Sequence, residues 1–468
     1  MLRRLRHLWH GPLALLLLAA LCSMAKAQAP PPPPPAEDTT GVTNGVLVDA
    51  EGVLRRQVFA DPNGRLQRER VLAARAKLAP ELAKASKLRK VSLNRLEAAI
   101  RARAGRSMPA TEEMRYLAGM TRLQYVFYYP DTKDIVLAGP AEGWSEDLSG
   151  RPRGLTTGRP VLELQDLVVA LRAFPPGAKK SPTILCSIDP SQEGLQRMQE
   201  FLRTLGGRAT PADTQMIVDG LRTRLGMQSI RVGGIPANTH FAQVMIESDY
   251  RMKLIGIGVE KPPIHLASYV DKASPSQVNQ NALQRWFFTP DYECVRVSAD
   301  ELGMQLIGDG VKLVGEDQVV AKDGSRQTTK RTNRASQLFV EGFTRKYASL
   351  AAKAPVFAQL RNVIDLAIAA AFIQKQDYYG QAGWSLGVLA DERTVPVETY
   401  NTPLQVETVV ASVWKGRRLM TPVGGGVHIQ PRMALSSSNL RADEEGSVST
   451  THDGISLKNL AADRWWWD

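Results

Sequence analysis

Residues 355–376 read PVFAQLRNVIDLAIAAAFIQKQ. Apolar side chains recur along this stretch at helical spacing, and no residue from 366 to 373 is polar. A helix that is apolar on every side must be wrapped by protein or by lipid. Arg361, Asp365 and Lys375 interrupt the apolar run, which is therefore too short to span a membrane. The stretch predicts the central buried helix of a soluble domain.

The composition is that of an ordinary globular protein, with 468 residues, 43% of them hydrophobic and 23% charged. This length is enough for two or three domains. The predicted fold class is α+β: a mixed α/β core with an antiparallel sheet and a central buried helix, preceded by a helical N-terminal arm. The core is expected to span residues 111–376, followed by a β-rich extension over residues 377–435.

The N-terminus predicts a secretory signal peptide over residues 1–27. Arginines lie within residues 3–6, an apolar segment spans residues 13–21, and a small-x-small cleavage pattern, AKA, ends the segment. The alternatives are an uncleaved membrane anchor and a lipoprotein site at Cys22, which lacks a small residue directly before it. The expected location of the mature protein is the periplasm or the extracellular medium.

The chain is basic, with 59 Lys and Arg against 47 Asp and Glu and a formal net charge of +12. Loss of the signal peptide lowers this charge by four, because that segment carries four basic and no acidic residues. A basic exported protein is expected to be drawn to anionic surfaces: acidic polysaccharide, cell-wall polymers or a membrane. The alternative is that the charge serves only solubility. Nothing in the sequence predicts a specific nucleic-acid partner or an oligomeric state.

Residues 28–64 are predicted to hold a proline-rich leader and a short hairpin. An unbroken proline run at residues 30–35 is typical of a polyproline II spacer or of a disordered leader. Residues 46–59 read as two strands around a turn at residues 49–52.

Residues 65–110 are predicted to form a basic helical arm. Between residues 65 and 104 there are twelve Lys and Arg against three Glu. Pro80 divides the segment, and Ser92 is the predicted N-cap of its last helix. The functional interpretation is a cationic arm that touches an anionic polymer, and the alternative is a solvated helical face.

Helix and strand patterns alternate between residues 160 and 260, which predicts an α/β layer. Within it, residues 240–263 are predicted to run from a helix into an apolar strand, LIGIG. Four strand-like segments follow from residue 284 and predict an antiparallel sheet. Residues 436–468 are polar, so we expect a disordered tail that ends in the cluster Trp465-Trp466-Trp467. This cluster is interpreted as a docking tag, as a segment that folds back on its own domain, or as a tail without a role.

Six segments of the chain resemble a bacterial family of exported proteins. They read YLAGM (116–120), LQYVFYYPDTKDIVLAGPAEGW (123–144), ILCSIDPSQEGL (184–195), ESDYRMKLIGIGVE (247–260), RWFFTPDYECVRVSADELGMQLIGDGVKLVGED (285–317) and FAQLRNVIDLAIAAA (357–371). The family is catalogued only as a domain of unknown function. The resemblance covers about residues 92–376, and it implies no activity, cofactor or site residue for this chain.

The sequence lacks the common motifs of metal, nucleophile and phosphate sites. The four histidines beyond the signal peptide form no HExxH or HxH arrangement. One conceivable long-range metal site joins His240 to Glu247 and Asp249, and the alternative is a capping or surface histidine. Cys186 and Cys294 are interpreted as two free buried thiols or as a disulfide. We therefore assign no catalytic, cofactor or metal-binding residue.

Two pairs of residues are predicted binding candidates. Glu142 and Trp144 lie in a Gly/Pro-rich turn at a strand end, where loops often hold ligand contacts. Asp249 and Arg251 lie in a charged turn that leads into the LIGIG segment. The alternatives are a structural turn for the first pair and an internal ion pair for the second.

The leading hypothesis is a non-enzymatic envelope or extracellular protein that binds or scaffolds at an anionic surface. The alternative is a secreted hydrolase of a surface or environmental polymer, whose acid and base residues the sequence does not identify. A deep cleft that gathers the four binding candidates would favour the enzyme, and a flat basic face would favour binding.

Overall fold

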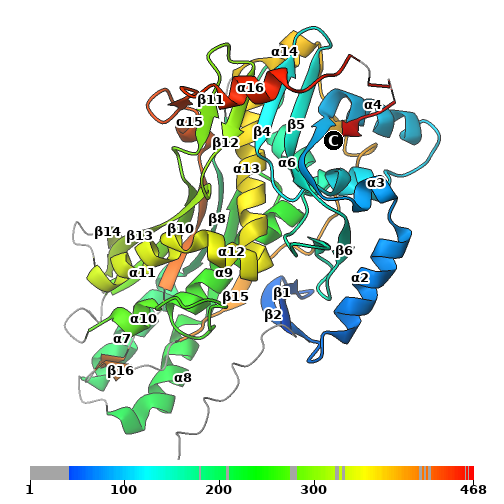
Figure 1. Ribbon diagram of the computed structural model, residues 1–468. Helices are drawn as coiled ribbons and strands as arrows, with labels where there is room; N and C mark the ends of the chain where they lie inside the picture. The colour runs from blue at the N-terminus through cyan, green and yellow to red at the C-terminus, as the bar shows by residue number, and fades with distance from the viewer. Residues whose placement is uncertain are drawn as a thin grey trace, which may run out of the picture. The chain divides into compact units, whose positions relative to one another are not determined.

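The predicted central helix is α13 (Pro355–Lys375), which runs through the middle of the ribbon in Figure 1. Pro355 occupies its first turn, and every residue from Val356 to Ile373 is buried. The helices that pack against it are α6 (Leu164–Ala173), α9 (His240–Gly256), α12 (Tyr347–Lys353), α14 (Tyr378–Ala382) and α15 (Pro431–Ala434). By length and hydropathy α13 could cross a membrane, but its apolar window is wholly buried within the protein. The prediction of a central buried helix is confirmed.

The computed structural model describes residues 42–178, 181–206, 210–274, 282–321, 326–328, 333–410, 414–415, 418–419 and 423–468, the last range without 459 and 462. The described residues from Val42 to Asp468 belong to one compact unit. The predicted signal peptide and the proline run at residues 30–35 lie outside the described residues.

The larger sheet has nine strands in the described part of the chain. In spatial order they are β1 (Val42–Val48), β2 (Val53–Ala60), β15 (Gln405–Glu407), β9 (Met227–Gly233), β8 (Ile184–Pro190), β18 (Val423–Ile429), β10 (Ala282–Pro290), β13 (Val311–Val320) and β14 (Arg326–Thr328). β1 and β2 form the predicted hairpin, in which Val48 lies opposite Leu54. The pairs β2–β15 and β10–β18 are parallel, and the other pairs are antiparallel.

β18 has the sequence VGGGVHI and lies at the centre of this sheet, between β8 and β10. Gly425 has a φ of +136°, and a Cβ there would clash with backbone atoms of Trp286. At Gly426 a Cβ would clash with the backbone carbonyl of Cys186. The glycines therefore permit the close backbone approach on both sides of the strand. The segment expected as a separate β-rich extension thus supplies a central strand of the main sheet.

The second sheet has seven strands among the described residues. Their order is β19 (Arg441–Ala442), β11 (Val295–Val297), β12 (Gly303–Leu306), β4 (Tyr125–Tyr129), β5 (Asp134–Ala141), β3 (Ser86–Ser92) and β20 (Trp466–Trp467). β4 and β5 form a hairpin around residues 130–133, as the turn residues Pro130 and Asp131 between two strand-like segments predict. The prediction of a single antiparallel sheet from residue 284 is wrong, because β10 and β13 lie in the larger sheet while β11 and β12 lie in this one.

The predicted strand over LIGIG is wrong, because α9 continues as a helix from His240 to Gly256. α9 packs on β8, β10 and β18 and so covers the centre of the larger sheet. Its last residue, Gly256, lies so close to the Trp286 ring that a Cβ would clash with it. A short apolar run has the same sequence pattern in a buried helix as in a buried strand, so the sequence does not distinguish the two. Here the run belongs to a helix that is buried because it packs against the larger sheet.

The predicted helical arm is only partly helical. α2 (Arg65–Lys77) and α3 (Pro80–Ala83) come first, β3 follows, and α4 (Leu93–Ala104) comes last. The predicted N-cap is present, since the Ser92 hydroxyl accepts a hydrogen bond from the Arg95 N–H at 3.3 Å. The expectation of helix across residues 86–92 is wrong, because this segment pairs with β5 and β20.

The expected disordered tail at residues 436–468 is wrong, because this segment is built into the fold. α16 (Ser447–Asp453) packs on β12, and β20 pairs with β3. Trp465 and Trp466 are buried, and the guanidinium groups of Arg89 and Arg464 lie 4.8 and 4.3 Å from the centre of the Trp466 ring. Of the three interpretations of the tryptophan cluster, the structure agrees with the second, in which the C-terminal segment folds back on its own domain.

Helices and strands together confirm the α+β class. The other helices are α5 (Glu112–Arg115), α7 (Gln192–Leu205), α8 (Thr214–Leu225), α10 (Tyr269–Lys272) and α11 (Arg334–Arg345). Within the described ranges, two further two-stranded sheets join β6 (Trp144–Glu146) to β7 (Pro152–Gly154) and β16 (Trp414–Lys415) to β17 (Arg418–Leu419). Cys186 and Cys294 are buried free thiols, so the disulfide alternative is not realised between them.

Candidate functional site

The first predicted binding pair holds two loops together. Glu142 is buried, and its carboxylate accepts hydrogen bonds from the backbone N–H groups of Thr156 and Thr157, at 2.7 and 3.2 Å, and from the Thr157 hydroxyl. Trp144 is buried against Tyr116, with ring centroids 5.7 Å apart, and lines a cavity beside α2. These contacts correspond to the structural alternative, in which the turn after β5 is anchored to the loop after β7.

The second pair lies in the middle of α9, so the predicted turn there is wrong. Asp249 is fully buried and accepts a hydrogen bond from the Lys253 ammonium at 2.7 Å. The same ammonium donates to the Ile188 carbonyl at 2.9 Å. Arg251 is buried and donates to Glu260 at 2.7 Å. Both residues therefore make internal ion pairs, as the alternative interpretation has it.

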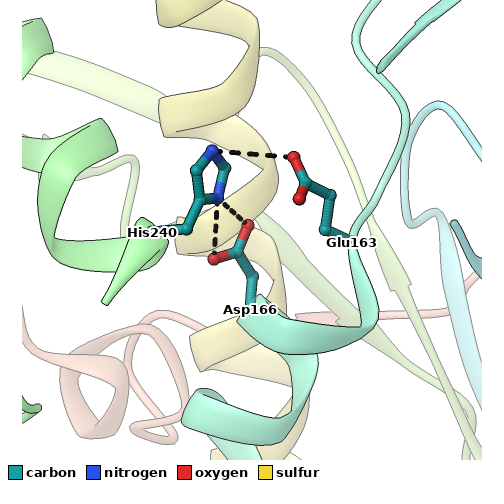
Figure 2. A group of neighbouring side chains, drawn as sticks. All are labelled: Glu163, Asp166 and His240. Carbon is teal, nitrogen blue, oxygen red and sulfur yellow. Dashed lines mark hydrogen bonds and ion pairs between the residues drawn. The ribbon is translucent and has the colours of Figure 1, made fainter. Parts of the chain in front are cut away.

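Three residues that the sequence does not group meet at the start of α9 (Figure 2). His240 is the first residue of α9, Glu163 directly precedes α6, and Asp166 lies in the first turn of α6. His240 Nδ1 lies 2.9 Å from Asp166 Oδ2, and Nε2 lies 3.6 Å from Glu163 Oε1. One potential ligand atom from each residue falls within 4.8 Å of the other two.

Local features of the two helices place these side chains. The Thr239 hydroxyl caps α9 by accepting a hydrogen bond from the Ala242 N–H at 3.3 Å, and Phe241 is fully buried, so the first turn of α9 is fixed. α6 and α9 pack on each other and on α13. The N-terminal end of a helix carries partial positive charge, which favours the carboxylates of Glu163 and Asp166 at the start of α6.

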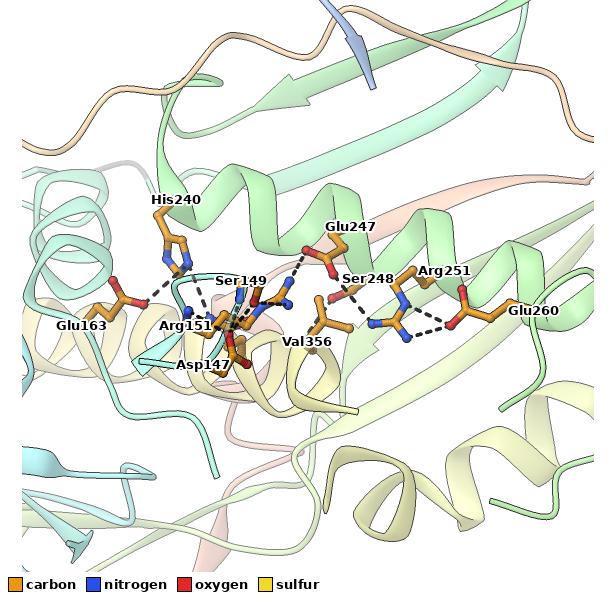
Figure 3. Close-up of polar contacts among 11 residues, drawn as sticks. Asp147, Ser149, Arg151, Glu163, His240, Glu247, Ser248, Arg251, Glu260 and Val356 are labelled. Carbon is orange, nitrogen blue, oxygen red and sulfur yellow. Dashed lines mark hydrogen bonds and ion pairs between the residues drawn. The ribbon is translucent and has the colours of Figure 1, made fainter. Parts of the chain in front are cut away.

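Arg151 and Gln359 connect this cluster to the next turns of α9. Figure 3 shows Arg151 between His240 and Glu247. Arg151 donates from Nε to Gln359 Oε1 at 2.8 Å and from Nη2 to Glu247. Because Gln359 Oε1 accepts from Arg151, the amide NH₂ of Gln359 is the group that faces His240 Nε2, at 3.5 Å. Glu247 is 5% exposed, and its Oε1 has no hydrogen-bond partner among the described residues, although Arg251 Nη1 lies 3.7 Å away.

A cavity of about 370 Å³ opens at this network, and its wall is mainly polar. The wall includes His240, Glu163, Glu247, Arg151, Gln359 and Tyr400. A second cavity of about 870 Å³ has a more apolar wall, which includes Ile100, Val168 and Val395. The two cavities share five wall residues: Arg115, Tyr116, Glu163, Gln165 and Glu398. Neither of these two cavities, as the described residues form them, is lined by any of the four predicted binding candidates.

The charges in the cluster act strongly on one another. Burial lowers the pKa of His240, but the negative charges of Asp166 and Glu163 outweigh burial and raise the pKa to about 10. Burial raises the pKa of Glu163, and the charge of His240 opposes this rise. In the ligand-free protein His240 is therefore an imidazolium at neutral pH, which is a counter-ion for two carboxylates and a poor general base.

α2 presents a different kind of surface, which is basic and exposed. The helix carries Arg65, Arg68, Arg70, Arg75 and Lys77 against Glu69, and none of its 13 residues is buried. Leu66 and Leu72 are 43% and 65% exposed. At its sides the helix is tied down, because Arg70 donates to the Asp147 carbonyl at 2.8 Å and Lys77 pairs with Glu112 at 2.7 Å.

Residues 186–269 match a family described as a protein of unknown function, DUF1598. This match confirms the expected resemblance to an uncharacterised family. The matched segment contains His240 and all of α9, but neither Glu163 nor Asp166. No curated protein and no solved structure matches the chain.

Sequence reasoning missed Glu163 and Asp166 and joined His240 to the wrong acids. Glu247 and Asp249 follow His240 on the same helix, but Asp166, its hydrogen-bond partner, lies 74 residues earlier in the chain. The sequence signal for this cluster was weak. It consisted of two acidic residues at the start of α6 and a histidine at the start of α9.

Proposed function

We propose that this chain is an exported, non-enzymatic protein that binds an anionic membrane surface through α2. The observation that supports the proposal is the composition of this exposed helix, with five basic residues against one acidic residue and two exposed leucines. Arg65, Arg68, Leu72 and Arg75 are three or four residues apart and so share one face. Basic residues attract anionic headgroups, and leucine side chains gain from burial at the acyl boundary. An acidic polysaccharide would attract the same cations but would give the leucines no apolar environment.

The proposal is tested with vesicles that contain phosphatidylglycerol and with the variant Arg65→Gln/Arg68→Gln/Arg75→Gln. Each basic residue near an anionic membrane contributes about 1 kcal/mol, so the triple variant should bind about 100-fold more weakly. Binding of the unaltered protein should weaken as salt is added. The measurement is the partition coefficient in a sedimentation assay.

The matched control removes three exposed cations from other elements: Arg345→Gln/Lys353→Gln/Arg393→Gln. It has the same net charge as the α2 variant but should keep nearly full affinity. Equal loss in both variants would show that only net charge matters and would overturn the role of α2. Retention on heparin that depends on α2, without any binding to vesicles, would assign the helix to a polysaccharide instead.

Export is the second part of the proposal, and the tripartite pattern of residues 1–27 supports it. N-terminal sequencing of the protein isolated from its native host should begin at Gln28. A cytoplasmic protein that retains Met1 would contradict export. The proposal that α2 binds an anionic membrane would then depend on the vesicle assay alone.

A second candidate function, a hydrolase of a surface polymer, is favoured by the polar cavity. The carboxyl groups of Glu163 and Glu247 line the same wall, and such a pair could share acid and base roles. A hydrolase should release soluble fragments from labelled cell-wall polymer, and Glu247→Gln should abolish the release. Release that persists in this variant, or no release by the unaltered protein, removes this candidate.

A further inference from the structure

We propose that His240 and Glu163 bind a divalent transition-metal ion in the wall of the 370 Å³ cavity, with Asp166 as the residue that orients the imidazole. Imidazole and carboxylate ligands are the donors that Zn²⁺ and similar ions use in proteins. This site goes beyond surface binding by α2 and uses none of its residues.

The two nitrogen atoms of His240 have unequal partners. Nδ1 lies 3.1 and 2.9 Å from the two oxygens of Asp166, so it donates its hydrogen to that carboxylate. Metal-binding histidines commonly donate the hydrogen of one ring nitrogen to a carboxylate in this way, which fixes the ring and leaves the other nitrogen for the ion. Asp166 therefore selects Nε2 as the metal ligand.

His240 Nε2 lacks a well-placed partner in the described part of the chain. The groups that face it are Glu163 Oε1 at 3.6 Å, which is beyond hydrogen-bond distance, and the Gln359 NH₂ group at 3.5 Å. The contact between Arg151 and Gln359 Oε1 holds the amide in this orientation. An ion between Nε2 and Glu163 Oε1 would contact both atoms at once, and on binding it would replace the Nε2 proton of the imidazolium, which is released to water.

Glu163 is held in an orientation that suits metal binding. Gln165 Nε2 donates to Glu163 Oε2 at 2.7 Å, so Oε1 is the oxygen that faces His240. Glu163 is 8% exposed, and its side chain is therefore largely shielded from bulk solvent while it borders the cavity. Both proposed ligand atoms are thus positioned by a hydrogen bond on the opposite side of their own group.

Glu247 adds a further carboxylate to the wall of this cavity. It is 5% exposed, lines the same wall, and its Oε1 has no hydrogen-bond partner among the described residues. Buried carboxylate oxygens are normally hydrogen-bonded. Glu247 Oε1 is shielded from the cavity and lies 3.7 Å from Arg251 Nη1, so the ligands that complete the coordination of an ion are water molecules, for which the cavity has room.

The experiment is calorimetric titration of the full chain with ZnCl₂. The unaltered protein should bind one Zn²⁺ per chain. Asp166→Asn should weaken binding about 10- to 100-fold, as expected for a residue that orients a ligand, and His240→Ala and Glu163→Gln should weaken it further. Titration with Co²⁺ should give visible absorption bands that change in Glu163→Gln, which a merely structural role of Glu163 would not produce.

His265→Ala is the matched control, because His265 is an exposed histidine outside the cavity. Loss of affinity in this control equal to that in His240→Ala would indicate adventitious surface binding and would overturn the proposal. So would the absence of Zn²⁺ binding, or binding that His240→Ala and Glu163→Gln both retain. Glu163→Gln is close in shape to the native residue and keeps the test valid if His240→Ala does not fold. Zn²⁺ is titrated without vesicles, and vesicle binding is measured with EDTA, so the site and the proposed function can fail separately.

Discussion

α9 carries two groups of polar contacts that differ in what surrounds them. At its start, His240 has one nitrogen bonded to Asp166 and the other directed to a cavity. Farther along, the Lys253 ammonium uses all three of its hydrogens, on Asp249 and on the carbonyls of Ile188 and Gly425. Figure 3 shows His240 with Glu163 and, farther along the helix, the buried pair of Arg251 and Glu260.

The comparison teaches that burial and charge do not by themselves mark a binding site. Asp249 is less exposed than His240, and its pair with Lys253 is shorter than the distance from His240 to Glu163. The His240 group differs because its Nε2, with contacts of 3.5 and 3.6 Å, borders a cavity, whereas the Oδ1 of Asp249, which also lacks a hydrogen-bond partner among the described residues, is sealed inside the protein. An ion pair that is sealed inside a protein serves the fold, whereas one that borders a cavity is available to a ligand.

The largest effect is expected for Asp249→Ala. This change leaves the Lys253 ammonium buried without its anion, which should lower the free energy of unfolding by about 3 to 5 kcal/mol. Urea denaturation measures the loss. Asp219→Ala, which removes an exposed carboxylate from α8, is the control and should change the free energy by well under 1 kcal/mol (about 0.5 or less). Equal losses in the two variants would mean that the Asp249 pair is not sealed.

A smaller effect should appear as a pH dependence. Burial raises the pKa of Asp249 from 3.8 to about 6, although Lys253 opposes the rise. Between these values the folded chain keeps a proton that the unfolded chain releases, so this group makes stability fall as pH rises through the window. A shift of this size corresponds to about 2 to 3 kcal/mol.

The pH dependence is measured as the difference in unfolding free energy between the unaltered protein and Asp249→Asn. This difference should decrease from pH 4 to pH 7 and then stay level, because the amide does not titrate. A difference that is constant or that increases with pH would contradict the raised pKa of Asp249. It would mean that Asp249, like the His240 group, is accessible to water.

The smallest loss of stability is expected for His240→Ala. The carboxylates of Glu163 and Asp166 lose their counter-ion, but the cavity lets water reach Glu163, so the cost should be smaller than that of Asp249→Ala. The measurement is again urea denaturation, with EDTA present. A cost as large as that of Asp249→Ala would show that the two groups on α9 are equally sealed and would remove the contrast between them.

The candidate site could be predicted only in fragments. His240 stands out in the sequence as one of few histidines, and its place at a helix start follows from Thr239 and the pattern after it. Its pairing with Asp166 depends on the packing of α6 against α9, which no spacing along the chain encodes. At Asp249 and Arg251 the sequence predicted a binding turn where the structure has the middle of a buried helix. A charged run inside a helix resembles a turn when the burial of the helix is not known.

The sequence by itself determined the features that depend on neighbouring residues: the burial of α13, the β1–β2 and β4–β5 hairpins and the cap at Ser92. These follow from periodicity, turn chemistry and capping, which act over a few residues. Only the tertiary structure decided the sheet to which each strand belongs, the burial of the C-terminal tryptophans and the meeting of His240 with Glu163 and Asp166. Each of these is a contact between distant segments, whose free energy depends on the surface that the rest of the folded chain presents.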